Sequence, residues 1–148
     1  MAVDVRTSIE IDAPRARVAA FAADPQNAPQ WYVNIASVSL ETPPPVGVGS
    51  RMAFVAHFLG RRIAYTYEVR ELVTNERFVM STAQGPFPMR TTYTWADSPT
   101  GGTLMTLRNE GDPSGFGQLA APVMAAAMRR ANTKDLQTLK RLLEQPAT

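Results

Sequence analysis

Apolar and polar residues alternate along most of this chain, and a period of two residues is typical of antiparallel strands with one buried face. The first segment shows the pattern fully. From Val3 to Asp12, every second side chain is aliphatic or threonine, while the side chains between them are charged or serine. Six further strands are predicted, at about residues 35–41, 51–58, 62–70, 78–83, 89–95 and 103–110. Seven such strands predict an antiparallel sheet with one face to cover.

An amphipathic helix is predicted at the end of the chain, starting at Phe116 or Leu119 and ending at Glu144. Pro122 lies near its start, so the helix is expected to begin or kink there. At 100° per residue, the apolar side chains form one stripe, made of Met124, Ala127, Met128, Ala131, Leu139 and Leu142. A sheet with one apolar face needs a cover, and we expect this helix to provide it.

Two short helices are predicted between the first and second strands. The first has Asp12 as its capping residue and Pro14 near its start, and it stops before Asp24. The second covers Pro25 to Trp31. The chain order is therefore strand, two short helices, six strands and a long helix.

The turn between the strands at 51–58 and 62–70 sets the pairing of these two strands. Gly60-Arg61 suits a two-residue hairpin turn with glycine in the first position. This turn would pair Leu59 with Arg62 and Phe54 with Tyr67. Paired residues share a face, so the tyrosine is expected to point inward beside Phe54.

The chain has 148 residues, which suits a single domain over residues 1–148 without a disulfide or structural metal. It contains no cysteine and one histidine, His57. The missing thiols exclude a disulfide framework, a thiolate zinc site, an iron–sulfur cluster and a cysteine nucleophile. A lone histidine also argues against a multi-histidine metal site or a histidine-based triad. We therefore predict no catalytic motif, no metal and no cofactor.

Charge and hydropathy indicate no nucleic-acid partner and no membrane span. Fifteen basic and 13 acidic residues give a net charge of +2, and the bases are scattered except at Arg61–Arg62 and Arg129–Arg130. A nucleic-acid binder concentrates its positive charge in a stripe. The start of the chain shows no apolar signal segment, and no run approaches 18 apolar residues. The sequence predicts a cytoplasmic protein.

The inward face of the predicted sheet is rich in aromatic residues, and Trp31 is expected at an entrance. The facing helix offers alanines, which leave space, and methionines, which adapt to varied apolar shapes. Apolar walls with a few polar tips are typical of small-molecule sites. The candidate ligand-binding residues are Trp31, Phe54, Tyr65, Tyr67, Met89, Thr91, Tyr93, Trp95, Asn109, Val123, Met124, Ala127 and Met128. A filled core fits the same pattern, because alanines also let a helix approach a sheet closely.

Other polar residues are assigned structural roles. His57 has the outward parity of its strand, so we expect it to be exposed rather than catalytic unless a one-residue bulge intervenes. The carboxylates expected to be solvated for the same reason are Glu68, Glu71 and Glu110. Asn132 and Asp135 fall on or beside the apolar stripe of the long helix, where a structural hydrogen bond or ion pair is favoured over catalysis. Residues 111–117 are interpreted as a mobile gate rather than a nucleotide loop.

The order of these segments resembles the helix-grip fold of the START/polyketide-cyclase superfamily (SRPBCC), which includes the birch-pollen-allergen proteins. The resemblance spans nearly the whole chain and rests on Ile11–Val18 with Phe21, Trp31, Val48–Arg51, Tyr67–Val69, Gly85–Pro88, Thr103–Leu107 and Asp135–Glu144. It implies an α+β fold: a seven-stranded curved antiparallel sheet wrapped around a long C-terminal helix, with two short helices between strands 1 and 2. It also implies a hydrophobic ligand between sheet and helix, which favours a cavity over a filled core. The family has no universal catalytic motif.

Three functions remain open from the sequence. The favoured one is binding of a hydrophobic small molecule or lipid, aromatic or polycyclic, by a monomer or homodimer. The second is a cyclase or dehydratase in which Tyr65, Tyr67 or Tyr93 polarises an enolisable carbonyl. The third is a protein-interaction module, as in superfamily members that contact respiratory lipids, ribosomes or other proteins.

Overall fold

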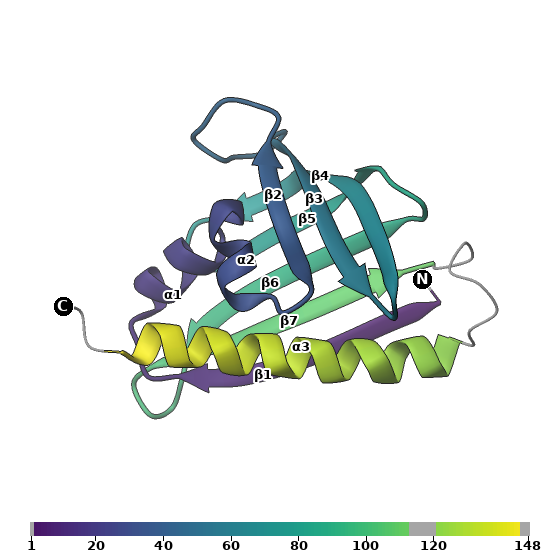
Figure 1. The fold of residues 1–148 in the computed structure, drawn as a ribbon. Helices are drawn as coiled ribbons and strands as arrows, with labels where there is room; N and C mark the ends of the chain where they lie inside the picture. The colour runs from purple at the N-terminus through teal and green to yellow at the C-terminus, as the bar shows by residue number, and fades with distance from the viewer. Residues whose placement is uncertain (1, 113–120, 146–148) are drawn as a thin grey trace.

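Seven antiparallel strands form one sheet in the computed structural model, which describes residues 2–112 and 121–145 (Figure 1). The strands are β1 (Val3–Ile11), β2 (Ile35–Leu40), β3 (Arg51–Phe58), β4 (Arg61–Val73), β5 (Arg77–Gln84), β6 (Met89–Asp97) and β7 (Thr103–Gly111). Their order across the sheet is β1-β7-β6-β5-β4-β3-β2. Every neighbour except β1–β7 is also a neighbour in sequence, so short hairpins build most of the sheet.

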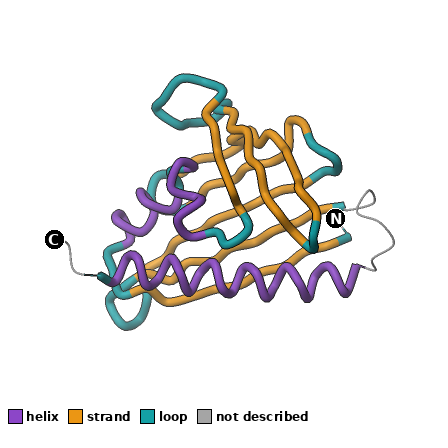
Figure 2. Tube along the Cα trace, viewed as in Figure 1, coloured by secondary structure: helices purple, strands orange, loops and turns teal. Residues whose placement is uncertain are grey.

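The helices lie on the concave side of the curved sheet. They are α1 (Arg15–Ala22), α2 (Ala28–Trp31), which follows a short 3-10 turn at Pro25–Asn27, and α3 (Ala121–Glu144). Figures 1 and 2 show α3 running beneath the sheet alongside β1, with α1 and α2 near its C-terminal end. Two α3 side chains fix it to β1, because Arg129 and Lys140 donate to the carbonyls of Arg6 and Glu10 at 3.2 and 2.9 Å. The predicted α+β helix-grip arrangement is confirmed.

The long helix is amphipathic as predicted, but of the predicted stripe only Met124 and Leu139 are buried, and the others are half-buried: Ala127, Met128, Ala131 and Leu142. Its described part begins at Ala121, one residue before Pro122. Its buried residues are Met124, Asn132, Asp135, Leu136, Leu139 and Leu143. The predicted starts at Phe116 or Leu119, and most of the predicted gate at 111–117, lie outside the described residues. No helix in the described part of the chain is long and apolar enough to cross a membrane.

The predicted capping role of Asp12 is wrong. The cap residue of α1 is Pro14, in an extended conformation with ψ 143°, and no side chain caps the helix. Asp12 lies two residues earlier, at the end of β1, where its backbone N–H donates to Glu144 Oε2 at 2.7 Å. Its position links the end of β1 to the end of α3.

The predicted turn between β3 and β4 is displaced by one residue. Leu59 and Gly60 form the turn, with φ of 51° and 77°, and Phe54 pairs with Tyr65 instead of Tyr67. Positive φ at both central residues is the geometry of a type I′ turn, whose twist matches the flanking strands. The pairing therefore slips by two residues, which preserves the faces: Tyr65 and Tyr67 still share the concave side with Phe54.

The β3–β4 turn offers a direct test of this geometry. Leucine in the left-handed region is strained by about 1–2 kcal/mol, whereas asparagine enters that region readily. Leu59 is 46% exposed, so its side chain adds little buried area. We expect Leu59→Asn to raise the free energy of unfolding by roughly 1 kcal/mol in denaturant titrations. Leu59→Ala is the control, since it removes the leucine without relieving the strain; equal stabilisation by both variants would contradict the explanation.

Candidate ligand-binding site

A cavity of about 140 Å³ lies between the concave face of the sheet and the N-terminal half of α3. Strands β3, β4, β6 and β7 supply most of one wall through inward side chains such as Phe54, Tyr65 and Met89. Met124 and Met128 supply part of the opposite wall from α3. The period of two along each strand and the 3.6-residue period of the helix aim these side chains at the same space.

The two halves of α3 have different roles. Met124, Met128, Asn132 and Asp135 line the cavity. Beyond them, the helix enters the main hydrophobic core through Leu136, Leu139 and Leu143, which pack with residues of the sheet, α1 and α2. The apolar stripe that the sequence predicts as one surface is thus divided between a cavity wall and a close-packed core.

Most of the predicted contact residues come together at this cavity. Those that line it are Phe54, Tyr65, Tyr67, Met89, Thr91, Tyr93, Asn109, Met124 and Met128. The aromatic rings among them contact one another: Phe54 stacks on Tyr65 with ring centroids 5.4 Å apart, and Tyr65 meets the edge of Tyr67 at 5.0 Å. The wall on the sheet side is therefore a connected aromatic surface.

Four predicted contact residues do not line the cavity. Trp31 is 1% exposed and lies in the core, with its ring 5.6 Å from that of Tyr93, so it does not form an entrance. Trp95 is also a core residue, because its position near the end of β6 brings it to the α1 end of the sheet. Val123 is 52% exposed, and Ala127 is half-buried outside the wall. Strand parity gave the correct face for Trp95 but not its position along the sheet.

Several wall residues were absent from the predicted set. They are Val3, Tyr32, Asn34, Ile35, Ala56, Phe58, Ile63, Met80, Phe87, Glu110, Gly111, Ala131, Asn132 and Asp135. Ala56, Phe58 and Ile63 share the inward parity of their strands, so the sequence pattern could have identified them. Tyr32 and Asn34 follow α2 in an irregular segment, where no periodicity indicates direction.

A chain of hydrogen bonds crosses the polar part of the cavity wall. The Tyr67 hydroxyl lies 2.8 Å from Thr91 Oγ1, which donates to Asn109 Oδ1 at 2.6 Å. Asn109 Nδ2 in turn donates to Asn132 Oδ1 on α3 at 3.2 Å. The chain therefore connects β4, β6 and β7 to the helix. Asn132 has the structural hydrogen bond that its place on the apolar stripe predicted.

The cavity tyrosines remain neutral. The hydroxyls of Tyr32 and Tyr93 lie 2.7 Å apart. Burial raises the pKa of Tyr67 to about 12, although its hydrogen bond to Thr91 opposes this effect. Burial also raises the pKa values of Tyr32, Tyr65 and Tyr93 well above the usual range. Their hydroxyls therefore act as neutral hydrogen-bonding groups and not as phenolate bases.

Asp135 is the buried carboxyl group of the site. Its side chain comes from α3, and its Oδ1 accepts a hydrogen bond from the backbone N–H of Val33 at 2.9 Å. Burial raises the pKa of Asp135 to about 7, and the hydrogen bond from Val33 opposes the rise only in part. The contact joins α3 to the segment between α2 and β2. The structural role predicted for Asp135 therefore corresponds to this backbone hydrogen bond.

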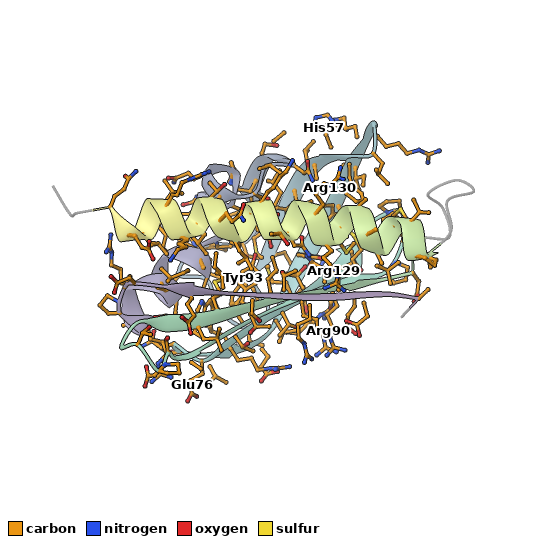
Figure 3. All side chains as sticks on the ribbon, turned by 90° about the horizontal axis from the view of Figure 1, so that it is seen from below. His57, Glu76, Arg90, Tyr93, Arg129 and Arg130 are labelled. Carbon is orange, nitrogen blue, oxygen red and sulfur yellow. The ribbon has the colours of Figure 1, made fainter. Side chains whose placement is uncertain are left out.

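His57 lies away from the cavity, as predicted. It is exposed on β3, and Figure 3 shows it at the margin of the molecule.

Among the described residues, no three histidine, cysteine, aspartate or glutamate side chains are grouped so that they could hold a metal ion. The described residues that line the cavity offer amide, hydroxyl and carboxyl groups on an apolar wall.

Comparison with known proteins identifies the same architecture. The family model described as polyketide cyclase/dehydrase and lipid transport matches residues 2–144. A START superfamily protein from Mycobacterium smegmatis superposes with a TM-score of 0.80 at 16% identity, covering 96% of this chain and 97% of that one. The Zhui aromatase/cyclase from Streptomyces sp. R1128 gives 0.76 at 15% identity, covering 95% and 93%.

A plant protein has the same fold. Ginseng major latex-like protein 151 from Panax ginseng superposes with a TM-score of 0.74 at 11% identity, covering 96% of this chain and 97% of that one. At these identities the superpositions establish the fold alone. No curated protein matches the sequence.

Proposed function

Because the chain belongs to the polyketide cyclase/dehydrase and lipid transport family, we propose that it binds a hydrophobic small molecule in the cavity between the sheet and α3. Apolar burial supplies most of the affinity, and the polar groups of the wall orient the ligand. The observation that carries this proposal is the connected aromatic wall of Phe54, Tyr65 and Tyr67 opposite the methionines of α3.

The cavity volume limits the size of the ligand. An apolar protein cavity of roughly 150 Å³ stays dry and accepts benzene. A volume of about 140 Å³ therefore suits a ligand with a single aromatic ring. A polycyclic compound or a lipid chain needs wall side chains to move, and the four methionines of the wall are the most adaptable of them: Met80, Met89, Met124 and Met128.

Filling the cavity is expected to abolish binding. Ala131 lines the cavity from α3, and Ala131→Phe places a ring in the space that the ligand needs. The probe is α-methylstyrene, an apolar single-ring compound, titrated into 15N-labelled protein and followed by two-dimensional NMR. We expect binding to the wild type, with shifts at cavity residues, and at least about tenfold weaker binding to Ala131→Phe, since overpacked space is costly to reopen.

The control for this experiment is Ala126→Phe, which adds the same ring on the exposed side of the same helix. It should bind α-methylstyrene as the wild type does. Unfolding titrations of both variants establish that they are folded. Equal binding by Ala131→Phe and the wild type, or shifts confined to the outer surface, would contradict the proposal.

A cyclase or dehydratase activity is the second candidate, and Asp135 is the observation that favours it. A buried carboxyl group with a pKa of about 7 at a cavity wall exchanges protons near neutral pH, as a general acid or base does. Tyr32 and Tyr93 line the same cavity and offer neutral hydroxyls. Turnover of a poly-β-ketone substrate that is lost in Asp135→Asn would support this candidate, whereas binding without turnover favours the binding function alone.

A further inference from the structure

One amide group of the cavity wall lacks a hydrogen-bond partner. In the described part of the chain, three buried side-chain N–H groups are unpaired: Nε1 of Trp31, Nε1 of Trp95 and Nδ2 of Asn132. The two indoles lie outside the cavity wall, but Asn132 lines the cavity and is only 3% exposed. Leaving a buried donor unpaired is unfavourable, and such groups are rare in native proteins. A hydrogen-bond acceptor on a molecule bound in the cavity would give Asn132 Nδ2 a partner.

The hydrogen-bond chain determines that this free group is a donor. Thr91 has one hydroxyl proton and gives it to Asn109 Oδ1, so the Tyr67 hydroxyl must donate to Thr91. Asn109 then donates through Nδ2 to Asn132 Oδ1. The carbonyl oxygen of Asn132 therefore already accepts a hydrogen bond, whereas its NH₂ group, which only donates, has no partner.

The charges of the wall select a neutral acceptor. Among the described residues that line the cavity there is no lysine, arginine or histidine, and the two carboxyl groups are Glu110 and Asp135. Glu110 already lies 3.6 Å from Arg108, while Asp135 is three residues from Asn132 on the same face of α3. A carboxylate ligand would be buried beside acidic groups without a cation, which is strongly unfavourable. A ketone, aldehyde, ester or amide oxygen meets no such repulsion.

We propose that the ligand is a neutral aromatic carbonyl compound whose carbonyl oxygen accepts a hydrogen bond from Asn132 Nδ2, while its ring packs against Phe54 and Tyr65. This assignment rests on the proposed function, since it requires that the cavity holds a ligand. It adds the chemical class of the ligand and makes Asn132 the residue that recognises it. Phe54 and Tyr65 stack with ring centroids 5.4 Å apart and present an aromatic surface for that ring.

Two single-ring probes of nearly the same shape separate the polar contact from apolar burial. Acetophenone carries a carbonyl oxygen where α-methylstyrene carries a CH₂ group. Asn132→Leu removes the amide and keeps a side chain of similar size, and Thr133→Leu, at the exposed next position, is the control. We expect Asn132→Leu to weaken acetophenone binding by roughly 2- to 10-fold, the usual net worth of a hydrogen bond, and to leave α-methylstyrene unweakened.

The wild-type protein gives an independent measurement. The side-chain amide protons of Asn132 are expected to shift downfield in the NMR spectrum when acetophenone is added, but not when α-methylstyrene is added. Benzoate, the anionic counterpart, should bind more than about tenfold more weakly than acetophenone at pH 8. These two results do not depend on the folding of any variant.

The outcomes separate this inference from the proposed function. If α-methylstyrene binds in the cavity and Asn132→Leu weakens both probes equally or neither, the role of Asn132 is wrong and ligand binding stands. If benzoate binds as well as acetophenone, the ligand class is wrong. If neither acetophenone nor α-methylstyrene binds the wild type, the proposed function itself fails.

Discussion

Replacing Asp135 by asparagine is expected to stabilise the protein at pH 8 by an amount on the order of 4 kcal/mol. Asp135 is 1% exposed, and burial raises its pKa from 3.8 to about 7. Each pKa unit corresponds to about 1.36 kcal/mol. Because the pKa rises from 3.8 to about 7, the ionised carboxylate destabilises the folded state by roughly 4 kcal/mol. Asparagine keeps an oxygen that accepts from the Val33 N–H and carries no charge at any pH.

The pH dependence of this effect has a definite sign. Between pH 3.8 and about 7, the folded protein holds a proton on Asp135 that the unfolded chain has lost. The free energy of unfolding therefore falls as the pH rises through this window, and the loss is complete above pH 7. Asp4 and Glu144 have lowered pKa values, so their contributions are lost only as the pH falls below the ordinary values of 3.8 and 4.5. The two effects occupy different pH ranges.

Denaturant unfolding at pH 5 and pH 8 measures the difference. The wild type should lose a few kcal/mol between the two pH values, and Asp135→Asn should lose much less. Asp97→Asn is the control. The side chain of Asp97 is 80% exposed, so this substitution should leave the loss of unfolding free energy between pH 5 and pH 8 as it is in the wild type. An unchanged decline in Asp135→Asn would show that Asp135 is not the group responsible.

Truncating Leu139 to alanine is expected to lower the free energy of unfolding by about 2–5 kcal/mol. Leu139 is 0% exposed and belongs to the main core cluster with Leu136 and Leu143. Alanine is the best helix former, so the loss cannot come from helix propensity. It comes from the removed apolar contacts and the space left inside a close-packed region.

Met128→Ala is the matched comparison on the same helix. Met128 is half-buried at the cavity wall, where space already lies beside its side chain. Its truncation should therefore cost less than that of Leu139, and it should change the affinity for α-methylstyrene. Leu139→Ala and Met128→Ala are both compared by denaturant titration and by binding of α-methylstyrene. These measurements test whether one half of α3 lines the cavity and the other packs in the core. Equal losses of stability would contradict a helix with one core-packed half and one cavity-lining half.

Periodicity along the chain was sufficient to predict the strands, the long helix and the covering of the sheet by that helix, whereas the helix-grip arrangement was implied by the family resemblance. The alternation from Val3 to Asp12 gave β1, and the apolar stripe from Met124 onward gave α3, because both patterns arise from local backbone geometry. Local sequence was less informative at the turns. The sequence placed the β3–β4 turn one residue too late. Leucine rarely adopts a positive φ, so the residue type of Leu59 did not indicate a turn position.

The cavity was harder to predict than the fold. Parity correctly turned Phe54, Tyr65 and Tyr67 inward and His57 outward, so the aromatic wall was identified. Parity could not separate Tyr93, which lines the cavity, from Trp95, which lies in the core on the same face of the same strand. That distinction depends on which helix covers each part of the sheet.

The sequence by itself determined which side chains face inward, because facing is set by the period of each element and needs no knowledge of distant residues. Only the tertiary structure decided what those side chains meet. The curvature of the sheet and the crossing of α3 leave space beside Met128 and close it beside Leu139. The same crossing brings Asn132 to Asn109 and Asp135 to Val33, over 23 and 102 residues of sequence. Contacts of that range depend on the whole fold, so no local pattern of residues could predict them.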